Sequence, residues 1–510
     1  MPNFDTTLQT MKSLTVIRSL PLVFLFHLTC LGLFAEEPAD LILRNGKIVL
    51  VDEKFQVVEA MAVRDGRVQA VGLNAEVSKL GNRDTRVIDL ENKMVLPGLL
   101  DSHVHPTGAS MFEANHEIPP METIADVLVY VRKRAKVVPK GEWIRLSQVF
   151  ITRLKEQRYP SRAELDSAAP DHPVVFRTGP DGSANSLALK ENGIDKAFAA
   201  EHPEHVMVDP KTGEPNGILR QASKVLKSKS NSTRKSLDET ARDERLIKLF
   251  HDYNRRGITG VIDRNCGNGA RTQYERLLDA DLLTLRVRAS RGVSAGGGKA
   301  EIEKRLDAIA ADPYFKKPDP RFGIIGVKVF QDGGMLTGSA YFQKPWGKSK
   351  IYGIKDPRYR GMQYVKEEQL ETLARACVER DLAFTAHCQG DAATTTLARV
   401  YARIDKDLPV APSRSSITHS SFMTPEAIRL AGKVGFGIDL QPAWLHQDGL
   451  TLQKHFGKER LKHFIPLKSL FDAGIKAGGG SDHMQRIGPL RSVNPYDPFL
   501  GMWITLTRKA

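Results

Sequence analysis

Short apolar runs alternate with longer helical stretches from residue 95 to the C-terminus. Strands that alternate with helices predict a parallel sheet built from β–α units. The predicted strands are Val95–His105, Gly260–Asp263, Leu285–Ala289, Ile325–Phe330, Leu382–His387, Ser416–His419, Gly437–Leu440 and Ile475–Ala477. Eight such strands predict an α/β fold with a (β/α)8 TIM-type barrel over residues 95–510.

Residues 36–94 carry a different pattern, in which short β-rich runs surround turn dipeptides. Leu41–Leu50 contains two short strands around Asn45-Gly46, and Met61–Val71 repeats this arrangement around Asp65-Gly66. These dipeptides supply the positive φ values of tight hairpins. The segment is therefore predicted to form a small N-terminal β-sandwich domain, too thin to bury a core by itself.

A long insertion separates the first two barrel strands. It covers about residues 111–235 and contains a predicted strand of its own at Val174–Phe176. A basic run from Lys224 to Lys235 lies at its end and contributes to the net charge of +14. Such a run can bind nucleic acid or an anionic surface, but this one lacks interleaved aromatic residues and is better explained as a solvated loop. We therefore expect a small-molecule substrate and neither a nucleic-acid nor a stable membrane partner, with homo-oligomer formation left open.

The N-terminus has the pattern of a secretory signal. Lys12 and Arg18 precede an apolar run from Leu20 to Leu33, and Ala35 fits a cleavage position. Residues 1–35 are therefore predicted to be a signal peptide that exports the protein to the periplasm or the extracellular space. The alternative is an uncleaved membrane anchor, although the run is short for a spanning helix.

Polar residues occur where the predicted barrel strands end. His103 and His105 lie two positions apart and therefore point to the same face of the first strand. The other polar residues of this set are Lys328, His387, His419 and Asp482. Because carboxyl ends of barrel strands meet at one mouth, these six side chains are expected to converge. Imidazole and carboxylate are ligands for Zn²⁺ or a similar divalent ion.

Each of these residues also has a simpler explanation. A single His at a strand end is usually a hydrogen-bonded structural residue, and Asp482 is compatible with a helix N-cap. Lys328 would normally be solvated, but the alternation of Val327-Lys328-Val329 directs it into the barrel lumen. Burial there lowers its pKa, so that the amine can react with CO₂ to give a carbamate. The joint pattern, rather than any single residue, indicates a metal centre.

Five motifs resemble the amidohydrolase superfamily, and within it the amidohydrolase 3 group that includes N-substituted formamide deformylase. The motifs are Val95–His105, Val327–Gly333, Ala386–Ala393, Arg414–His419 and Gly480–Asp482. The resemblance implies one ion held by His103, His105 and Asp482. It implies a second ion at His387 and His419, with carboxylated Lys328 between them. One or two divalent ions, most simply zinc, are expected.

The resemblance also implies a function. We expect hydrolysis of a non-peptide C–N bond (amide, cyclic amide or N-formyl amine) by metal-activated hydroxide, with Asp482 as the catalytic proton acceptor and donor. The alternatives are a deaminase of cyclic amidines and a non-catalytic exported barrel inactivated by C-terminal truncation. Two departures from the group bear on this choice: Asp181-Gly182-Ser183 stands where Asp-Gly-His is usual, and the chain ends at Ala510, before the expected strands that complete the β-sandwich.

Overall fold

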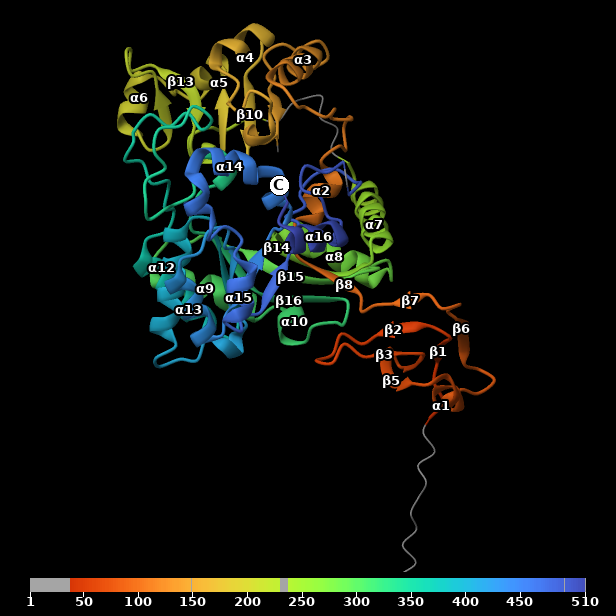
Figure 1. The fold of residues 1–510 in the computed structure, drawn as a ribbon. Coiled ribbons are helices and arrows are strands. Elements are labelled where there is room, and N and C mark those ends of the chain that lie inside the picture. The colour runs from red at the N-terminus through yellow and green to blue at the C-terminus, as the bar shows by residue number, and fades with distance from the viewer. Residues whose placement is uncertain (1–36, 148, 230–236, 490, 510) are drawn as a thin grey trace, which may run out of the picture. The chain divides into compact units, whose positions relative to one another are not determined.

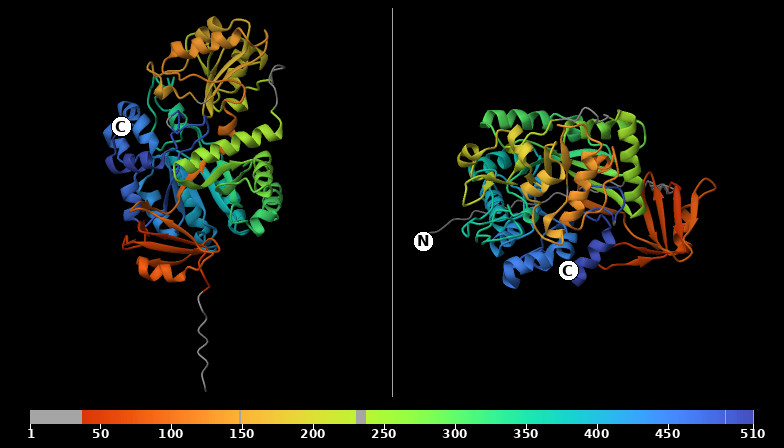
Figure 2. Two further views of the ribbon diagram at one scale, coloured as in Figure 1. Left: turned by 90° about the vertical axis from the view of Figure 1, so that its right-hand side faces the viewer. Right: turned by 90° about the horizontal axis from the view of Figure 1, so that it is seen from above.

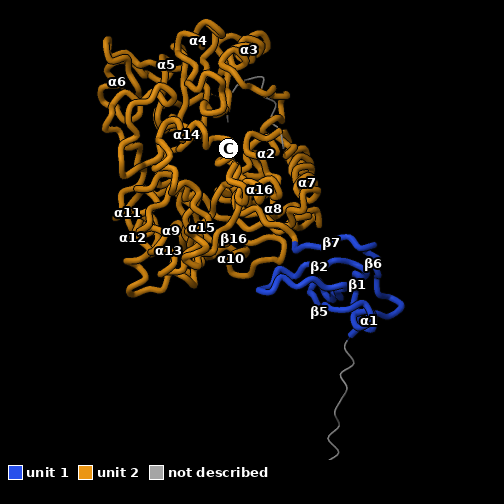
Figure 3. The backbone as a smooth tube through the Cα atoms, viewed as in Figure 1, with its two compact units in different colours: residues 1–97 blue, residues 98–510 orange. Residues whose placement is uncertain are grey.

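The computed structural model describes residues 37–147, 149–229, 237–489 and 491–509. The predicted signal peptide, residues 1–35, lies outside the described residues. The chain forms two compact units, residues 1–97 and residues 98–510 (Figure 3). In the described part of the chain, no helix combines the length and apolarity that crossing a membrane requires.

The first unit contains two small sheets. One has the strand order β5-β4-β1-β6 and the other β3-β2-β7. Its elements are β1 (Leu41–Arg44), β2 (Lys47–Val49), β3 (Val57–Val58), β4 (Ala60–Arg64), β5 (Arg67–Gly72), α1 (Asn74–Val77), β6 (Arg86–Asp89) and β7 (Met94–Val95). A few buried side chains, including Ile42, Ala62 and Val77, form its core.

One of the two predicted hairpins is correct and the other is wrong. Asp65 and Gly66 have φ values of 49° and 70° and join β4 to β5 in an antiparallel pair, as predicted. Asn45 also has a positive φ of 55°, but β1 and β2 do not pair across it. Both edges of β1 are already occupied, by β4 and β6, so the turn passes the chain to the second sheet.

The second unit contains the predicted barrel. Its strands are β8 (Leu99–Val104), β14 (Ile258–Cys266), β15 (Arg286–Gly292), β16 (Phe322–Phe330), β17 (Ala383–Cys388), β18 (Ser416–His419), β19 (Gly437–Leu440) and β20 (Ala477–Gly479). Each strand pairs in parallel with the next one in the chain. The residues after β20 close the ring, because the Asp482 N–H donates to the His103 carbonyl at 2.8 Å and the His105 N–H donates to the His483 carbonyl at 2.8 Å. The (β/α)8 prediction is therefore confirmed.

Helices surround these strands (Figure 1). They are α2 (Pro106–Met111), α7 (Glu239–Arg255), α8 (Asn268–Asp279), α9 (Lys299–Ala310), α10 (Pro313–Lys316), α11 (Glu367–Val378), α12 (Asp391–Ile404), α13 (Pro425–Val434), α14 (Ala443–Leu461), α15 (Leu467–Asp472) and α16 (Pro498–Thr507). In α12, Leu397, Tyr401 and Ile404 recur at helical spacing and are fully buried. The Tyr401 hydroxyl donates to the carbonyls of Phe384 and Ser416, which fixes α12 against β17 and β18.

The insertion after β8 folds over one end of the barrel, as the views in Figures 1 and 2 agree. We call its described residues, 112–147 and 149–229, the cap. A five-stranded sheet of order β12-β13-β11-β10-β9 forms its centre, where the sequence had predicted a single strand. Its elements are α3 (Ile124–Ala135), β9 (Ile144–Leu146), α4 (Arg162–Ala168), β10 (Val174–Thr178), β11 (Asp181–Ala184), α5 (Ser186–Glu191), α6 (Lys196–Glu201), β12 (Val206–Val208) and β13 (Pro215–Leu219).

Candidate metal centre

The six predicted side chains gather at the end of the barrel that the cap covers. We call them the floor: His103, His105, Lys328, His387, His419 and Asp482. All of them except His103 line one cavity of about 830 Å³. His103 is fully buried among the others and stacks on His419, with ring centroids 4.7 Å apart. Residues more than 370 positions apart in the sequence, such as His103 and Asp482, therefore reach one point.

The floor is continuous from one side of the cavity to the other. The ring centroid of His103 is 5.2 Å from that of His105, and the centroid of His419 is 4.6 Å from that of His387. The Lys328 ammonium lies 4.8 Å from the ring centroid of Phe330, which in turn lies 5.5 Å from the His387 ring.

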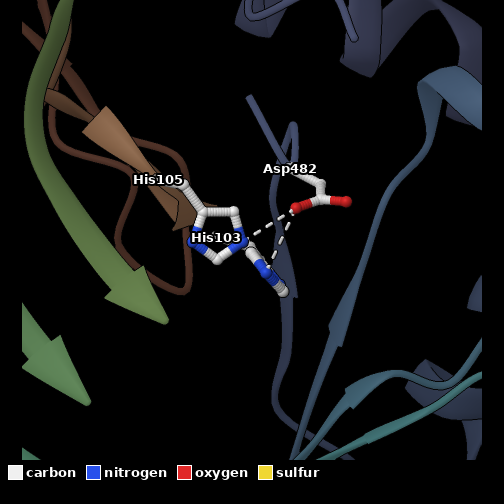
Figure 4. A group of neighbouring side chains, drawn as sticks. All are labelled: His103, His105 and Asp482. Atoms are coloured by element: carbon white, nitrogen blue, oxygen red, sulfur yellow. Dashed lines mark ion pairs between the residues drawn. The ribbon is translucent and has the colours of Figure 1, made fainter. Parts of the chain in front are cut away.

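Three of these residues can share one ion. The candidate ligand atoms of His103, His105 and Asp482 all lie within 4.8 Å of one another. The Oδ1 atom of Asp482 is 3.4 Å from Nε2 of His103 and 3.2 Å from Nε2 of His105. Figure 4 shows both imidazoles directed at this one oxygen, while the second carboxylate oxygen points away from them.

The buried imidazoles are oriented by partners on their Nδ1 atoms. Nδ1 of His103 lies 3.2 Å from a carboxylate oxygen of Asp439, and Nδ1 of His387 lies 3.0 Å from one of Asp332. Nδ1 of His419 lies 2.7 Å from the side-chain oxygen of Gln441. Because all three partners are acceptors, each ring carries its proton on Nδ1 and presents the lone pair of Nε2 to the cavity side.

Sequence reasoning had not singled out these supporting residues. Asp332 lies within the motif Val327–Gly333, and Asp439 is a charged residue inside the apolar run Gly437–Leu440. A carboxylate inside an apolar strand is buried and therefore needs a buried partner. A charged residue within an apolar run is thus the sequence signal that could have identified Asp439. Gln441 connects two of the rings, because its amide N–H donates to Asp439 at 2.7 Å while its oxygen accepts from His419.

Burial and neighbouring charges set the protonation of the floor. Burial lowers the pKa of His103 and His419 far below the usual value, so both rings are neutral, as metal ligands must be. Burial also lowers the pKa of Lys328 to about 8, against the opposing charges of Asp482 and Asp439. For Asp482, burial opposes ionisation, but the hydrogen bond from His105 and the charges of His105 and Lys328 outweigh it and the pKa is lowered.

Two atoms of the floor are suited to a cation. Among the described residues, Nε2 of His103 and Oδ1 of Asp482 are buried and make no hydrogen bond. Leaving a buried acceptor without a partner is costly, and a divalent ion satisfies both atoms at once. No helix begins at Asp482, so the N-cap explanation of this residue is wrong. The donor set of two imidazoles and one carboxylate therefore fits a divalent metal.

Two other polar residues near the floor do not belong to it. His483, which follows Asp482, is fully buried, and its ring nitrogens contact the Tyr253 hydroxyl and two backbone carbonyls. His483 therefore has a structural role. Ser183, which stands where a His is usual, is buried in β11 opposite Phe176 and does not line the cavity.

The cap supplies the other wall of the cavity. Its β10–β11 hairpin contributes Arg177, Gly179 and Pro180, and Gln221 and Ser223 follow from the segment after β13. Several apolar side chains also line the cavity: Phe112, Phe150, Phe330, Leu336 and Trp444. The cavity thus combines a polar, metal-suited floor with largely apolar walls, the usual composition of a small-molecule site.

A buried ion pair ties the cap to the loop after β16. Asp181 and Arg220 are both fully buried, with Oδ2 of Asp181 3.3 Å from the Arg220 guanidinium. The same oxygen accepts hydrogen bonds of 2.5 Å from the hydroxyls of Thr337 and Ser339. Arg220 also donates to the backbone carbonyls of Thr337 and Tyr352. Since every charge in this cluster has a partner, it holds the hairpin in place above the floor.

A family model described as the amidohydrolase family matches residues 86–510. The chain belongs to the amidohydrolase family. This amidohydrolase is therefore a hydrolase, and it has the barrel fold that the strand pattern had predicted.

Known proteins resemble the amidohydrolase over most of its length. N-substituted formamide deformylase of Arthrobacter pascens is 25% identical over 491 residues, which cover 92% of this chain and 84% of the relative. Protein LONG AFTER FAR-RED 3 of Arabidopsis thaliana is 25% identical over 472 residues, covering 89% and 77%. The crystal structure of an uncharacterized metal-dependent hydrolase from Pyrococcus furiosus superimposes with a TM-score of 0.60 at 19% identity, covering 91% of this chain and 87% of that one. The last similarity supports the fold.

Proposed function

We propose that this amidohydrolase hydrolyses a non-peptide C–N bond in an amide, a cyclic amide or an N-formyl amine. The observation that carries the proposal is the convergence of the floor, with two buried ligand atoms left without hydrogen bonds, at the base of a cavity of about 830 Å³. The similarity to a formamide deformylase over 92% of the chain supports this bond type.

The grouping of the floor supports the proposed ligand assignment. His103, His105 and Asp482 would hold one ion, and His387 and His419 would hold a second if two are bound. Lys328, whose pKa is lowered to about 8, has a larger neutral fraction at pH 7 than an exposed lysine and can take up CO₂ as a carbamate that bridges the two positions. A bound divalent ion, which we propose to be zinc, supplies Lewis acidity and activates water.

Asp482 is the proposed catalytic residue. One of its oxygens faces His103 and His105, which leaves the other free to accept a proton from the attacking water. The same carboxyl then returns the proton to the leaving nitrogen, as general base and general acid in turn. Asp439, Asp332 and Gln441 are positioning residues that fix the three buried rings.

The direct test is elemental analysis of the purified protein followed by hydrolysis assays on N-formyl and N-acyl amines. We expect metal in the wild type, and in Asp482→Asn a loss of turnover of roughly 100-fold or more with part of the metal retained. Asp381→Asn is the matched control, because Asp381 is exposed and its φ of 57° suits asparagine equally well. An unchanged rate in Asp482→Asn would refute this role, and ammonia release from cyclic amidines alone would favour a deaminase.

Export is a separate proposal that rests on the N-terminal sequence. Lys12, Arg18 and the apolar run that follows are typical of a secretory signal. Fractionation of expressing cells, with N-terminal sequencing of the product, tests it. Cleavage near Ala35 is expected, and an intact N-terminus in the cytosol would overturn it.

A further inference from the structure

Arg177 is a charged residue of the cavity wall, and in the described part of the chain its guanidinium has no hydrogen-bond or ion-pair partner. It projects from β10, in the hairpin that the cap contributes to the cavity wall. Within the described residues, no hydrogen bond or ion pair joins its side chain to the protein. Its cross-strand neighbour is Gly182, which offers no side chain on that face.

The nearby carboxylate cannot serve as this partner. Asp181 already accepts from Arg220, Thr337 and Ser339 on one oxygen and from the Gln221 backbone N–H on the other. Arg177 is nevertheless half-buried, and burial lowers its pKa with only partial compensation from Asp181. A guanidinium withdrawn from water without a counter-charge costs stability, so its presence on the cavity wall calls for a partner that enters the cavity.

The floor does not supply that partner. The acidic residues of the cavity lining are engaged elsewhere: Asp332 accepts from His387 and three backbone N–H groups, and Asp263 accepts from Tyr274. Asp482 faces His103 and His105. The cavity therefore has a metal-suited floor and, on its cap wall, a cation without a counter-charge. The side chain of Gln221, on the same wall, is another available donor.

We propose that Arg177 binds a carboxylate on the substrate, so that the substrate class is an N-acyl or N-formyl amine carrying an acidic group, such as an N-formyl amino acid. This inference rests on the proposed function. The planar guanidinium matches a carboxylate through two parallel hydrogen bonds, and the aromatic side chains of the cavity suit an apolar substituent. In the reaction, water adds to the formyl carbon, the C–N bond breaks and the nitrogen takes a proton. The products are formate and the free amino acid, whose own carboxylate is unchanged.

The test compares two probes of nearly equal size, N-formylphenylalanine and N-formylphenylalaninamide, which differ in the negative charge. The wild type is expected to prefer the acid by about 10- to 100-fold in kcat/KM, chiefly through KM. In Arg177→Met the KM for the acid rises until the preference disappears, while kinetics on the amide stay within a factor of about three. Arg177→Lys keeps part of the preference, and Arg429→Met, an exposed arginine on α13, keeps all of it.

Calorimetric titration with the same two probes separates this inference from the proposed function. If neither probe is hydrolysed by the wild type, the proposed function fails for this substrate class. Tighter binding of the acid that is lost in Arg177→Met would still support the carboxylate site. Equal binding of both probes to the wild type, or equal weakening of both in Arg177→Met, would overturn it.

Discussion

The floor and the cap enclose the same cavity but are built in different ways. Each floor residue lies at or beside a barrel strand, and three of the rings are fixed by acceptors at or just after other barrel strands, as His103 is by Asp439 of β19. The cap is held to a loop and a helix of the barrel by ion pairs: Asp181 with Arg220, which reaches the loop after β16, and Arg153 with Asp448 of α14. The comparison indicates that chemistry depends on the rigid barrel, whereas substrate choice depends on an added layer that can vary separately.

The largest effect is expected from removing a floor ligand. His103→Ala deletes a buried Nε2 that makes no hydrogen bond among the described residues. Metal affinity and turnover should fall by more than the roughly 10- to 100-fold that follows loss of an outer-shell partner. Metal per chain, measured by elemental analysis, and N-formyl amine hydrolysis report the loss. His251→Ala, an exposed histidine on α7, is the matched control. Full metal content in His103→Ala would contradict the assignment of the floor.

The second-largest effect is expected from a substitution in the cap that lowers the stability of the protein. Arg220→Met leaves the Asp181 carboxylate buried without its cation, which should lower the free energy of unfolding by roughly 3–5 kcal/mol. Urea unfolding measures this change, and metal per chain should stay at the wild-type value because Arg220 contacts no floor residue. Arg399→Met breaks an exposed pair with Glu426 and should cost less than about 1 kcal/mol. If Arg220→Met also emptied the metal site, the floor and the cap would not be independent.

The contrast between barrel and cap also explains which parts of the structure the sequence predicts. The barrel strands and the six floor residues follow from local pattern, because alternation fixes which face Lys328 or His103 occupies and parallel strand ends converge. The cap sheet does not follow from local pattern. Its strands β9 to β13 are short, β11 pairs with β13 rather than with β12, and the partner of Arg220 lies 39 positions away. The predicted hairpin at Asn45-Gly46 does not form for a related reason. The long-range pairing of β1 with β4 and β6 overrides the local turn signal.

A smaller effect is expected from a positioning residue behind the floor. Asp439→Asn weakens the hydrogen bond that orients Nδ1 of His103. It also removes the negative charge that now lies 3.3 Å from the Arg264 guanidinium. Metal affinity should fall by roughly 10- to 100-fold, with the fold retained. Competition with a chelator measures it. Asp407→Asn, in an exposed pair with Arg375, should leave metal affinity unchanged, and an equal loss there would assign the effect to net charge rather than to His103.

The smallest effect should appear at the start of α4 in the cap. Ser161 accepts from the Glu164 N–H at 3.2 Å, and the Glu164 carboxylate accepts from the Ser161 N–H at 2.8 Å, which forms a capping box. Ser161→Ala removes half of this exchange and should cost about 1 kcal/mol in urea unfolding, whereas Ser161→Thr should restore it. Because α4 lies in the cap, metal affinity should not change. A loss of metal in Ser161→Ala comparable to that in Asp439→Asn would mean that cap and floor are coupled through the fold, and the distinction drawn between them would be wrong.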